Sequence, residues 1–263
     1  MLSISLQLLN ISRPDSLLSR PFIFATFARN IFFVNYSHLF FDLDKTLWDF
    51  DANSSASLDQ IYTEFNLVSF YADPEEFKRI YNKYNDELWE RYRNGTILKA
   101  ELRSLRFELT LQEKSPADKK LAYDIGERYM YITPRMNILK PNTLSTLDYL
   151  KEKNYSLYIL TNGFLETQEN KMRHSRIDGY FKRLFSSEEL GINKPKKEIF
   201  HWAVSSIHAR KKECLMVGDD LKVDIEGAMN YGMDAIWYNP EGLGSDLKPS
   251  RTIQDLAELK TFL

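Results

Sequence analysis

Two carboxylates, Asp42 and Asp44, stand directly after the apolar run LFF in the segment HLFFDLDKTLWDFD. Residues two apart at the end of a strand project to the same side, so both carboxylates face one spot. Such a pair repels itself unless a cation lies nearby or one member is protonated. Both conditions suit catalysis, because a nearby Mg²⁺ ion needs hard oxygen ligands and acid–base chemistry needs carboxyl groups of different pKa. A carboxylate can also act as a nucleophile. An isolated D-x-D pattern is more often a solvated loop in which one Asp caps a turn, so other segments must decide.

Two further segments offer groups that bind anions. Thr161, Asn162 and Gly163 end the apolar run YIL with a hydroxyl, an amide and exposed backbone N–H groups. Lys194 precedes Pro195, which we expect at the first position of a helix, and its ammonium can neutralise phosphate oxygens. Each segment alone also fits an ordinary structure, a helix cap for TNG and a surface lysine for KP.

A third segment, LMVGDDLKVD, places Asp219, Asp220 and Asp224 directly after an apolar run. Gly218 lets the backbone come close to a ligand. Three acids within six residues are more than the cap of one helix requires. A site for a cation or a proton therefore fits this segment better than a helix cap alone.

The elements that must position these residues alternate along the chain. Short apolar runs at HLFFDL, YSLYILTNG, CLMVGDD and DAIWYNP predict strands buried on both faces, as in a parallel sheet. Helical patterns are predicted between them at 142–153, 166–175, 196–209 and 223–231. This alternation predicts a doubly wound α/β domain, in which ligands bind beyond the carboxyl ends of the strands.

Residues 52–133 break this alternation. Their apolar residues recur at helical spacing, which predicts four helices and no strand. Turn and boundary residues punctuate the helices at Pro74, Gly95, Pro116 and Pro134. We therefore expect a helical insert between the first and second strands.

Residues 1–33 differ in composition from the rest, with Arg13, Arg20 and Arg29 against one acid, Asp15. The segment fits an organellar transit peptide, a secretory signal interrupted by Arg and Pro, or translated upstream sequence with the natural start near Val34. We favour the last interpretation and leave residues 1–33 out of the fold prediction.

The length, composition and net charge of the chain restrict the class of protein. A length of 263 residues with 43% hydrophobic and 27% charged residues is typical of a globular protein with one large domain or two modest ones. A formal net charge of −2 argues against binding to nucleic acid polymers or anionic membranes. The single cysteine, Cys214, and the lack of an apolar run of about 18 residues lead us to expect a cytoplasmic location.

The patterns D-x-D-x-T, T-N-G, K-P and G-D-x-x-x-x-D occur in this order, each at a predicted strand end or helix start. Together they resemble the haloacid dehalogenase superfamily, in its Mg²⁺-dependent phosphatase branch, over about residues 36–240. The insert also matches the position of that superfamily's helical cap. The resemblance implies a doubly wound, Rossmann-like parallel-sheet core over 34–51 and 134–263 and an all-helical cap over 52–133.

The resemblance implies a role for each residue of the four patterns. Asp42 would be the nucleophile, and Asp44 the general acid that protonates the leaving alcohol and then the base that activates water. Thr161 and Lys194 would stabilise the transferring phosphoryl group. The residues expected to bind phosphate are Thr161, Asn162, Gly163 and Lys194.

The resemblance also implies a Mg²⁺ ion, held by the carboxylates of Asp42 and Asp219 and the backbone carbonyl of Asp44. Dehalogenases of the superfamily lack the second Asp, so the presence of Asp44 indicates that the substrate is a phosphate ester. A phosphomutase would have both acids as well, so that alternative stays open. Supporting roles are expected for Thr46, which would steady the loop around Asp42, and for Asp220 and Asp224, which would hold metal-bound water or orient Lys194.

The segments FFDLDKTLWDFDANS, LWERYRNGTI, LRSLRF and KPKKEIF resemble the pyrimidine 5′-nucleotidase group of the superfamily. This implies hydrolysis of nucleoside monophosphates such as dUMP, UMP and dTMP. The candidate substrate residues are Trp48, Trp89, Tyr92 and Arg106, although aromatics at helical spacing more often pack a core.

Two other functions stay open. The chain could be a sugar-phosphate phosphatase or phosphomutase of the same superfamily, or a non-enzymatic regulatory protein that binds a partner through its cap. We expect a small phosphate monoester as substrate, no nucleic acid polymer or membrane as partner, and a monomer or homodimer.

Overall fold

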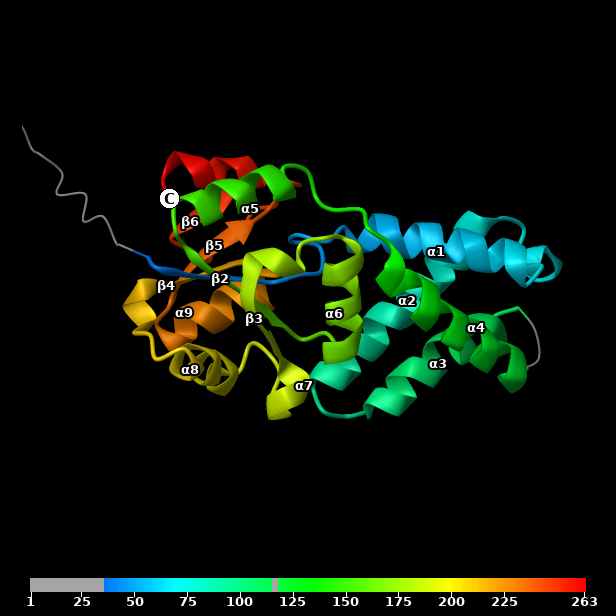
Figure 1. Cartoon of the computed structure of the whole chain (residues 1–263). Coiled ribbons are helices and arrows are strands. Elements are labelled where there is room, and N and C mark those ends of the chain that lie inside the picture. The colour runs from blue at the N-terminus through cyan, green and yellow to red at the C-terminus, as the bar shows by residue number, and fades with distance from the viewer. Residues whose placement is uncertain (1–35, 115–117) are drawn as a thin grey trace, which may run out of the picture. The chain divides into compact units, whose positions relative to one another are not determined.

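A parallel sheet of six strands forms the core of the protein in the computed structural model, which describes residues 36–114 and 118–263. The spatial order is β3-β2-β1-β4-β5-β6 (Figure 1). The strands are β1 (His38–Phe41), β2 (Ser156–Thr161), β3 (Phe181–Ser186), β4 (Cys214–Gly218), β5 (Asp234–Tyr238) and β6 (Arg251–Ile253). This confirms the predicted doubly wound fold, while the expectations about residues 1–33 lie outside the described residues.

The central strands are apolar on both sides because helices cover both faces of the sheet. Leu39 and Phe41 of β1 pack on one face with α5 (Thr143–Glu152), α6 (Leu165–His174) and the 3₁₀-helix Leu256–Thr261. Phe40 points to the other face, toward α8 (Lys197–Ser206) and α9 (Gly227–Tyr231). The strand period of two thus divides one run of three apolar residues between two cores.

Several elements differ from the sequence prediction. The strands β3 and β6 are the two edge strands of the sheet. Their exposed residues, including Lys182 and Arg183, interrupt the apolar runs by which the central strands were predicted. The helix expected over 223–231 is divided into a π-helix, Leu221–Glu226, and α9. A short helix, α7 (Ser187–Leu190), follows β3. Pro195 is not the first residue of a helix, because α8 begins at Lys197 after Lys196, whose backbone is extended.

The described residues of the insert after β1 form four α-helices, as predicted: α1 (Phe50–Glu64), α2 (Pro74–Arg93), α3 (Lys99–Gln112) and α4 (Lys119–Ile132). Asp73 and Asp118 cap α2 and α4 by accepting hydrogen bonds from backbone N–H groups of the first turn. The helices share an apolar cluster of their own, which includes Phe77, Tyr81 and Phe107. None of the helices in the described residues is both long and apolar enough to cross a membrane.

The two segments that join the helical insert to the core run side by side. The N–H of Asp49 donates to the carbonyl of Ile138 over 3.0 Å, and the N–H of Lys140 donates to the carbonyl of Leu47 over 2.8 Å. Buried Asn53 donates to the carbonyls of Asp49 and Ile138 and accepts from the Ile138 N–H. This pairing ties the beginning and the end of the insert together, while the domain boundaries at 34–51, 52–133 and 134–263 stay a prediction.

We predict that Asn53→Ala lowers the free energy of unfolding by roughly 1–3 kcal/mol, because it leaves backbone groups of both connecting segments without their partner. Urea denaturation measures this change. Asn82, an exposed residue in α2, provides the control variant Asn82→Ala, for which we expect little change. Equal stability of the two variants would show that Asn53 does not hold the connection together.

Candidate active site

The carboxyl ends of β1, β2 and β4 open into one cavity of about 400 Å³ that the helical insert also lines. A volume of this size falls within the usual range for small-molecule sites. The sequence-predicted residues that line it are Asp42, Asp44, Trp89, Arg106, Thr161, Asn162, Gly163, Lys194, Asp219, Asp220 and Asp224. The four patterns, although far apart in sequence, thus meet at one place.

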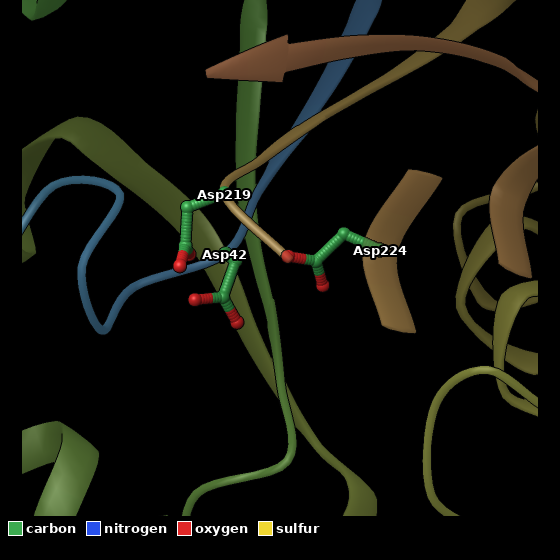
Figure 2. Close-up of side chains that lie close together, drawn as sticks. All are labelled: Asp42, Asp219 and Asp224. Carbon is green, nitrogen blue, oxygen red and sulfur yellow. The ribbon is translucent and has the colours of Figure 1, made fainter. Parts of the chain in front are cut away.

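Three carboxylates gather at the floor of this cavity. Figure 2 shows the side chains of Asp42, Asp219 and Asp224 close together, and one carboxylate oxygen of each lies within 4.8 Å of the others. Asp42 and Asp224 are buried. Hard oxygen donors of this kind fit a Mg²⁺ ion.

The electrostatics of the cluster also favour a cation. Burial, followed by repulsion from Asp224, raises the pKa of Asp219 to about 7. Burial also raises the pKa of Asp42 well above its ordinary value, opposed by Lys194 and assisted by Asp224 and Asp219. A divalent cation would favour the charged forms that burial and mutual repulsion disfavour.

Lys194 is a buried cation that joins three parts of the site. Its ammonium donates to Asp42 over 2.7 Å, to Asp224 over 2.6 Å and to the carbonyl of Leu160 over 2.7 Å. Burial lowers the pKa of Lys194, but Asp224 and Asp42 more than offset that effect, so the net shift is upward. The side chain of Asn162 accepts from the Lys194 N–H and donates to the Lys194 carbonyl, so the amide holds the lysine backbone in place.

Around the acids, each supporting residue has a defined contact. Thr46 is fully buried and donates its hydroxyl to Asp219 over 2.9 Å, so it orients that carboxylate directly. Asp224 accepts from Lys194 with one oxygen and from the Asp220 N–H with the other. Gly218 is required beside it, because a Cβ there would lie 2.3 Å from an Asp224 oxygen. Asp220 accepts from two N–H groups at the start of the π-helix.

The side chain of Asp44 is held by two residues of α6 that the sequence analysis missed. Lys171 donates to one carboxylate oxygen over 2.6 Å, and Gln168 donates to the other over 2.9 Å. Gln168 also donates to the Thr161 hydroxyl oxygen over 2.8 Å. Both are buried and stand three residues apart, so they share one face of α6. Polar residues on the inner face of a helix that follows T-N-G were the signal that could have indicated them.

Thr161 presents its hydroxyl proton to the cavity. Its oxygen accepts from the N–H of Gly163 over 3.0 Å and from Gln168. Because both contacts use the oxygen as an acceptor, the hydroxyl proton is available to an anion in the cavity.

The four candidate substrate residues have different positions. Trp89 and Arg106 line the cavity, while their contact with substrate stays a prediction. Trp48 is fully buried in the core, donates its ring N–H to the Met136 carbonyl and is not among the lining residues. Tyr92 is not among the lining residues and packs edge-on against Phe164. In both cases the aromatic ring serves packing.

Phe164 links the insert to the core directly after T-N-G. It stacks on Trp89 with ring centroids 5.5 Å apart, and it packs in one apolar cluster with Leu88 and Leu102. Lys99 of α3 forms an ion pair with Glu188 of α7. The wall of the cavity that the insert provides is therefore in contact with Phe164, the residue directly after the phosphate-binding segment expected at residues 161–163.

The fold is thus a parallel sheet with a helical insert after its first strand, and acids and a lysine gather at the carboxyl edge of the sheet. The family model for haloacid dehalogenase-like hydrolases matches residues 36–232. The chain belongs to this family.

Its relatives include two nucleotidases. The pyrimidine 5′-nucleotidase PynA of Streptococcus pneumoniae is 33% identical over 83% of this chain and 90% of its own length. The pyrimidine 5′-nucleotidase YjjG of Escherichia coli is 31% identical over 88% of this chain and 99% of its own. A glyceraldehyde 3-phosphate phosphatase of Pyrococcus furiosus is 29% identical over 76% of this chain and 79% of its own.

A solved structure provides the same fold. The putative hydrolase YfnB of Bacillus subtilis, bound to magnesium, superimposes with a TM-score of 0.78 and is 28% identical, covering 86% of this chain and 98% of its own.

We predict that Asp219→Asn raises the Mg²⁺ concentration needed for half-saturation by at least about tenfold, because an amide oxygen is a weaker ligand than a carboxylate. Isothermal titration and the Mg²⁺-dependent shift of the melting temperature measure binding without relying on turnover. Asp246, which is exposed, provides the control variant Asp246→Asn. An unchanged titration in Asp219→Asn would remove this residue from the metal site.

Proposed function

We propose that the protein is a Mg²⁺-dependent phosphomonoesterase that acts through an aspartyl-phosphate on Asp42, most readily on pyrimidine nucleoside monophosphates such as dUMP, UMP and dTMP. The observation that carries the proposal is the placement of Asp42, bonded to buried Lys194, and of Asp44 in one cavity. A nucleophile, a cation for the phosphate and a separate carboxyl for proton transfer are the groups that this reaction requires.

In the first step a carboxylate oxygen of Asp42 attacks phosphorus, and the bond between phosphorus and the ester oxygen breaks. Asp44 gives its proton to the departing alcohol. Negative charge spreads over the phosphoryl oxygens during transfer, and the Lys194 ammonium and the Thr161 hydroxyl stabilise that charge. The backbone N–H groups at Asn162 and Gly163 provide further donors.

In the second step Asp44 accepts a proton from water, and the resulting hydroxide attacks phosphorus. The bond between phosphorus and the Asp42 oxygen breaks, which releases phosphate and restores both carboxyl groups. Gln168 and Lys171 are positioning residues in this scheme, because they hold the two oxygens of Asp44 in the cavity.

The carboxylates of Asp42 and Asp219, with the backbone carbonyl of Asp44, would hold Mg²⁺. When bound, the ion offsets the repulsion between the carboxylates and the phosphate. Thr46 keeps Asp219 oriented for this role, and Asp224 keeps Lys194 beside Asp42.

The choice of substrate rests on the relatives and on the cavity. Both nucleotidases are 31% or more identical over at least 83% of this chain. Trp89 provides an aromatic wall on which a base can stack. The glyceraldehyde 3-phosphate phosphatase supports a sugar-phosphate phosphatase as the second candidate.

The direct test is phosphate release from nucleoside monophosphates and sugar phosphates, with Mg²⁺ and with EDTA. We expect pyrimidine monophosphates to be hydrolysed fastest, EDTA to abolish release, and Asp42→Asn to lower it by at least about a thousandfold. Fastest release from sugar phosphates would support the second candidate. Substantial activity of Asp42→Asn would contradict the assignment of the nucleophile, provided that contaminating phosphatase is excluded by a mock purification.

The role of Asp44 predicts a dependence on the leaving group. p-Nitrophenolate leaves without a proton, so Asp44→Asn should release about one equivalent of p-nitrophenol per enzyme and then stall, because water is no longer activated. On a nucleotide, whose alcohol needs the proton, the same variant should lose about 10²–10⁴-fold in kcat.

The same comparison tests the positioning role of Lys171. The second step needs Asp44 on every substrate, so the comparison is made on the first step alone. Lys171→Met should lower the single-turnover rate of alcohol release more on a nucleotide than on p-nitrophenyl phosphate, and exposed Lys248 provides the control variant Lys248→Met. Equal losses in this first step on both substrates would mean that Lys171 acts on folding or phosphate binding and not on proton transfer from Asp44.

A further inference from the structure

Arg106 of α3 is a buried cation in the wall of the cavity. The residue is only 4% exposed, and its guanidinium is a planar, delocalised cation. Among the residues that the structure describes, no carboxylate lies within 4.0 Å of it. Its contacts are neutral: the Tyr81 hydroxyl at 3.2 Å, the Asn85 amide oxygen at 3.3 Å and the Met130 sulfur at 3.4 Å.

The hydrogen-bonding capacity of this guanidinium is only partly used. Its Nε is buried and has no partner among the described residues. A buried charge without a counter-charge costs free energy unless a ligand supplies acceptors. The Tyr129 ring, 5.4 Å from the guanidinium carbon, makes a cation–π contact with it, but the ring does not serve as an acceptor for the unpartnered Nε.

Acceptors and donors lie side by side near Arg106. Asn85 accepts from Arg106, and its amide nitrogen lies 3.5 Å from a carboxylate oxygen of Asp86. Asp86 is exposed and lines the same cavity, as does Trp89 three residues further along α2. Residues three apart share a helix face, so an acceptor and an aromatic ring of α2 line the cavity together with the guanidinium of α3.

A cation, a carboxylate and an aromatic ring together fit a neutral ring with carbonyl oxygens. They fit a second anionic group of the substrate, in addition to its phosphate, less well. An anionic group would be attracted by Arg106 but repelled by Asp86. The edge of uracil or thymine alternates a carbonyl, an N–H and a carbonyl, so it offers acceptors to Arg106 and a donor to Asp86. Cytosine lacks that N–H, and its ring nitrogen would face a carboxylate.

We propose that Arg106 and Asp86, with Trp89 as a stacking wall, form the subsite that recognises the uracil or thymine ring of the substrate. This inference rests on the proposed nucleotidase function and specifies which residues select its base. Asn85 and Tyr81 are positioning residues in the subsite, because they hold the guanidinium from the side of α2.

The test compares kcat/KM for dUMP with kcat/KM for p-nitrophenyl phosphate, which carries no base. In Arg106→Met this ratio should fall about ten- to hundredfold, the loss expected for a hydrogen bond from a charged donor. Arg106→Lys should recover part of it. The control variant is Arg128→Met, at an ion pair with Glu64 on the surface of the insert, which should leave the ratio unchanged. An unchanged ratio in Arg106→Met would overturn the proposal.

A second measurement tests the subsite without hydrolysis of a nucleotide. Deoxyuridine, which has the base but no phosphate, should inhibit p-nitrophenyl phosphate hydrolysis competitively, and Arg106→Met should weaken that inhibition by at least about tenfold. Wild type should favour dUMP over dCMP, and Asp86→Asn should reduce that preference. An unchanged preference in Asp86→Asn would overturn the role of Asp86.

The outcomes separate the two proposals. If wild type hydrolyses dUMP well but Arg106→Met behaves like wild type, the nucleotidase function holds and the subsite is wrong. If carboxylate-bearing or bisphosphorylated sugars are hydrolysed fastest and depend on Arg106, the nucleotide substrate is wrong and Arg106 binds an anion.

Discussion

The buried Lys194 ammonium is the interaction on which the site depends. It reaches the nucleophile candidate Asp42 after β1, the Leu160 carbonyl in β2 and Asp224 after β4, so it joins three neighbouring strands. An ammonium without these partners could not remain charged at 1% exposure. Loss of either acid would remove one of the two charged partners of this buried ammonium, so the same contacts serve both the fold and the chemistry.

The acids around Lys194 carry more negative charge than one lysine compensates. The raised pKa of Asp219, about 7, expresses that excess together with burial. Folding alone would not favour three carboxylates within 4.8 Å of one another, whereas binding of a cation and a phosphate would. The insert completes this arrangement, because Phe164 places its wall next to the residues that follow β2.

Much of this architecture could be predicted from sequence, for identifiable reasons. The central strands are buried on both faces and therefore read as continuous apolar runs, and the motif residues stand at their carboxyl ends. The edge strand β3 could not be found in this way, because Lys182 and Arg183 are exposed. Gln168 and Lys171 lie 124 and 127 residues from Asp44, so only the fold reveals that they hold it. The burial of Trp48 could not be predicted either, since a tryptophan near a nucleophile candidate in sequence fits both a cavity wall and the core.

The most direct test of the central claim is to trap the covalent intermediate. Wild-type protein would be mixed with Mg²⁺ and dUMP, quenched in acid during turnover, and digested for peptide mass analysis. The account predicts one phosphoryl group on the peptide that contains Asp42, and its absence in Asp42→Asn. Rapid turnover with an unmodified Asp42 peptide, or with the phosphoryl group on another residue, would contradict it.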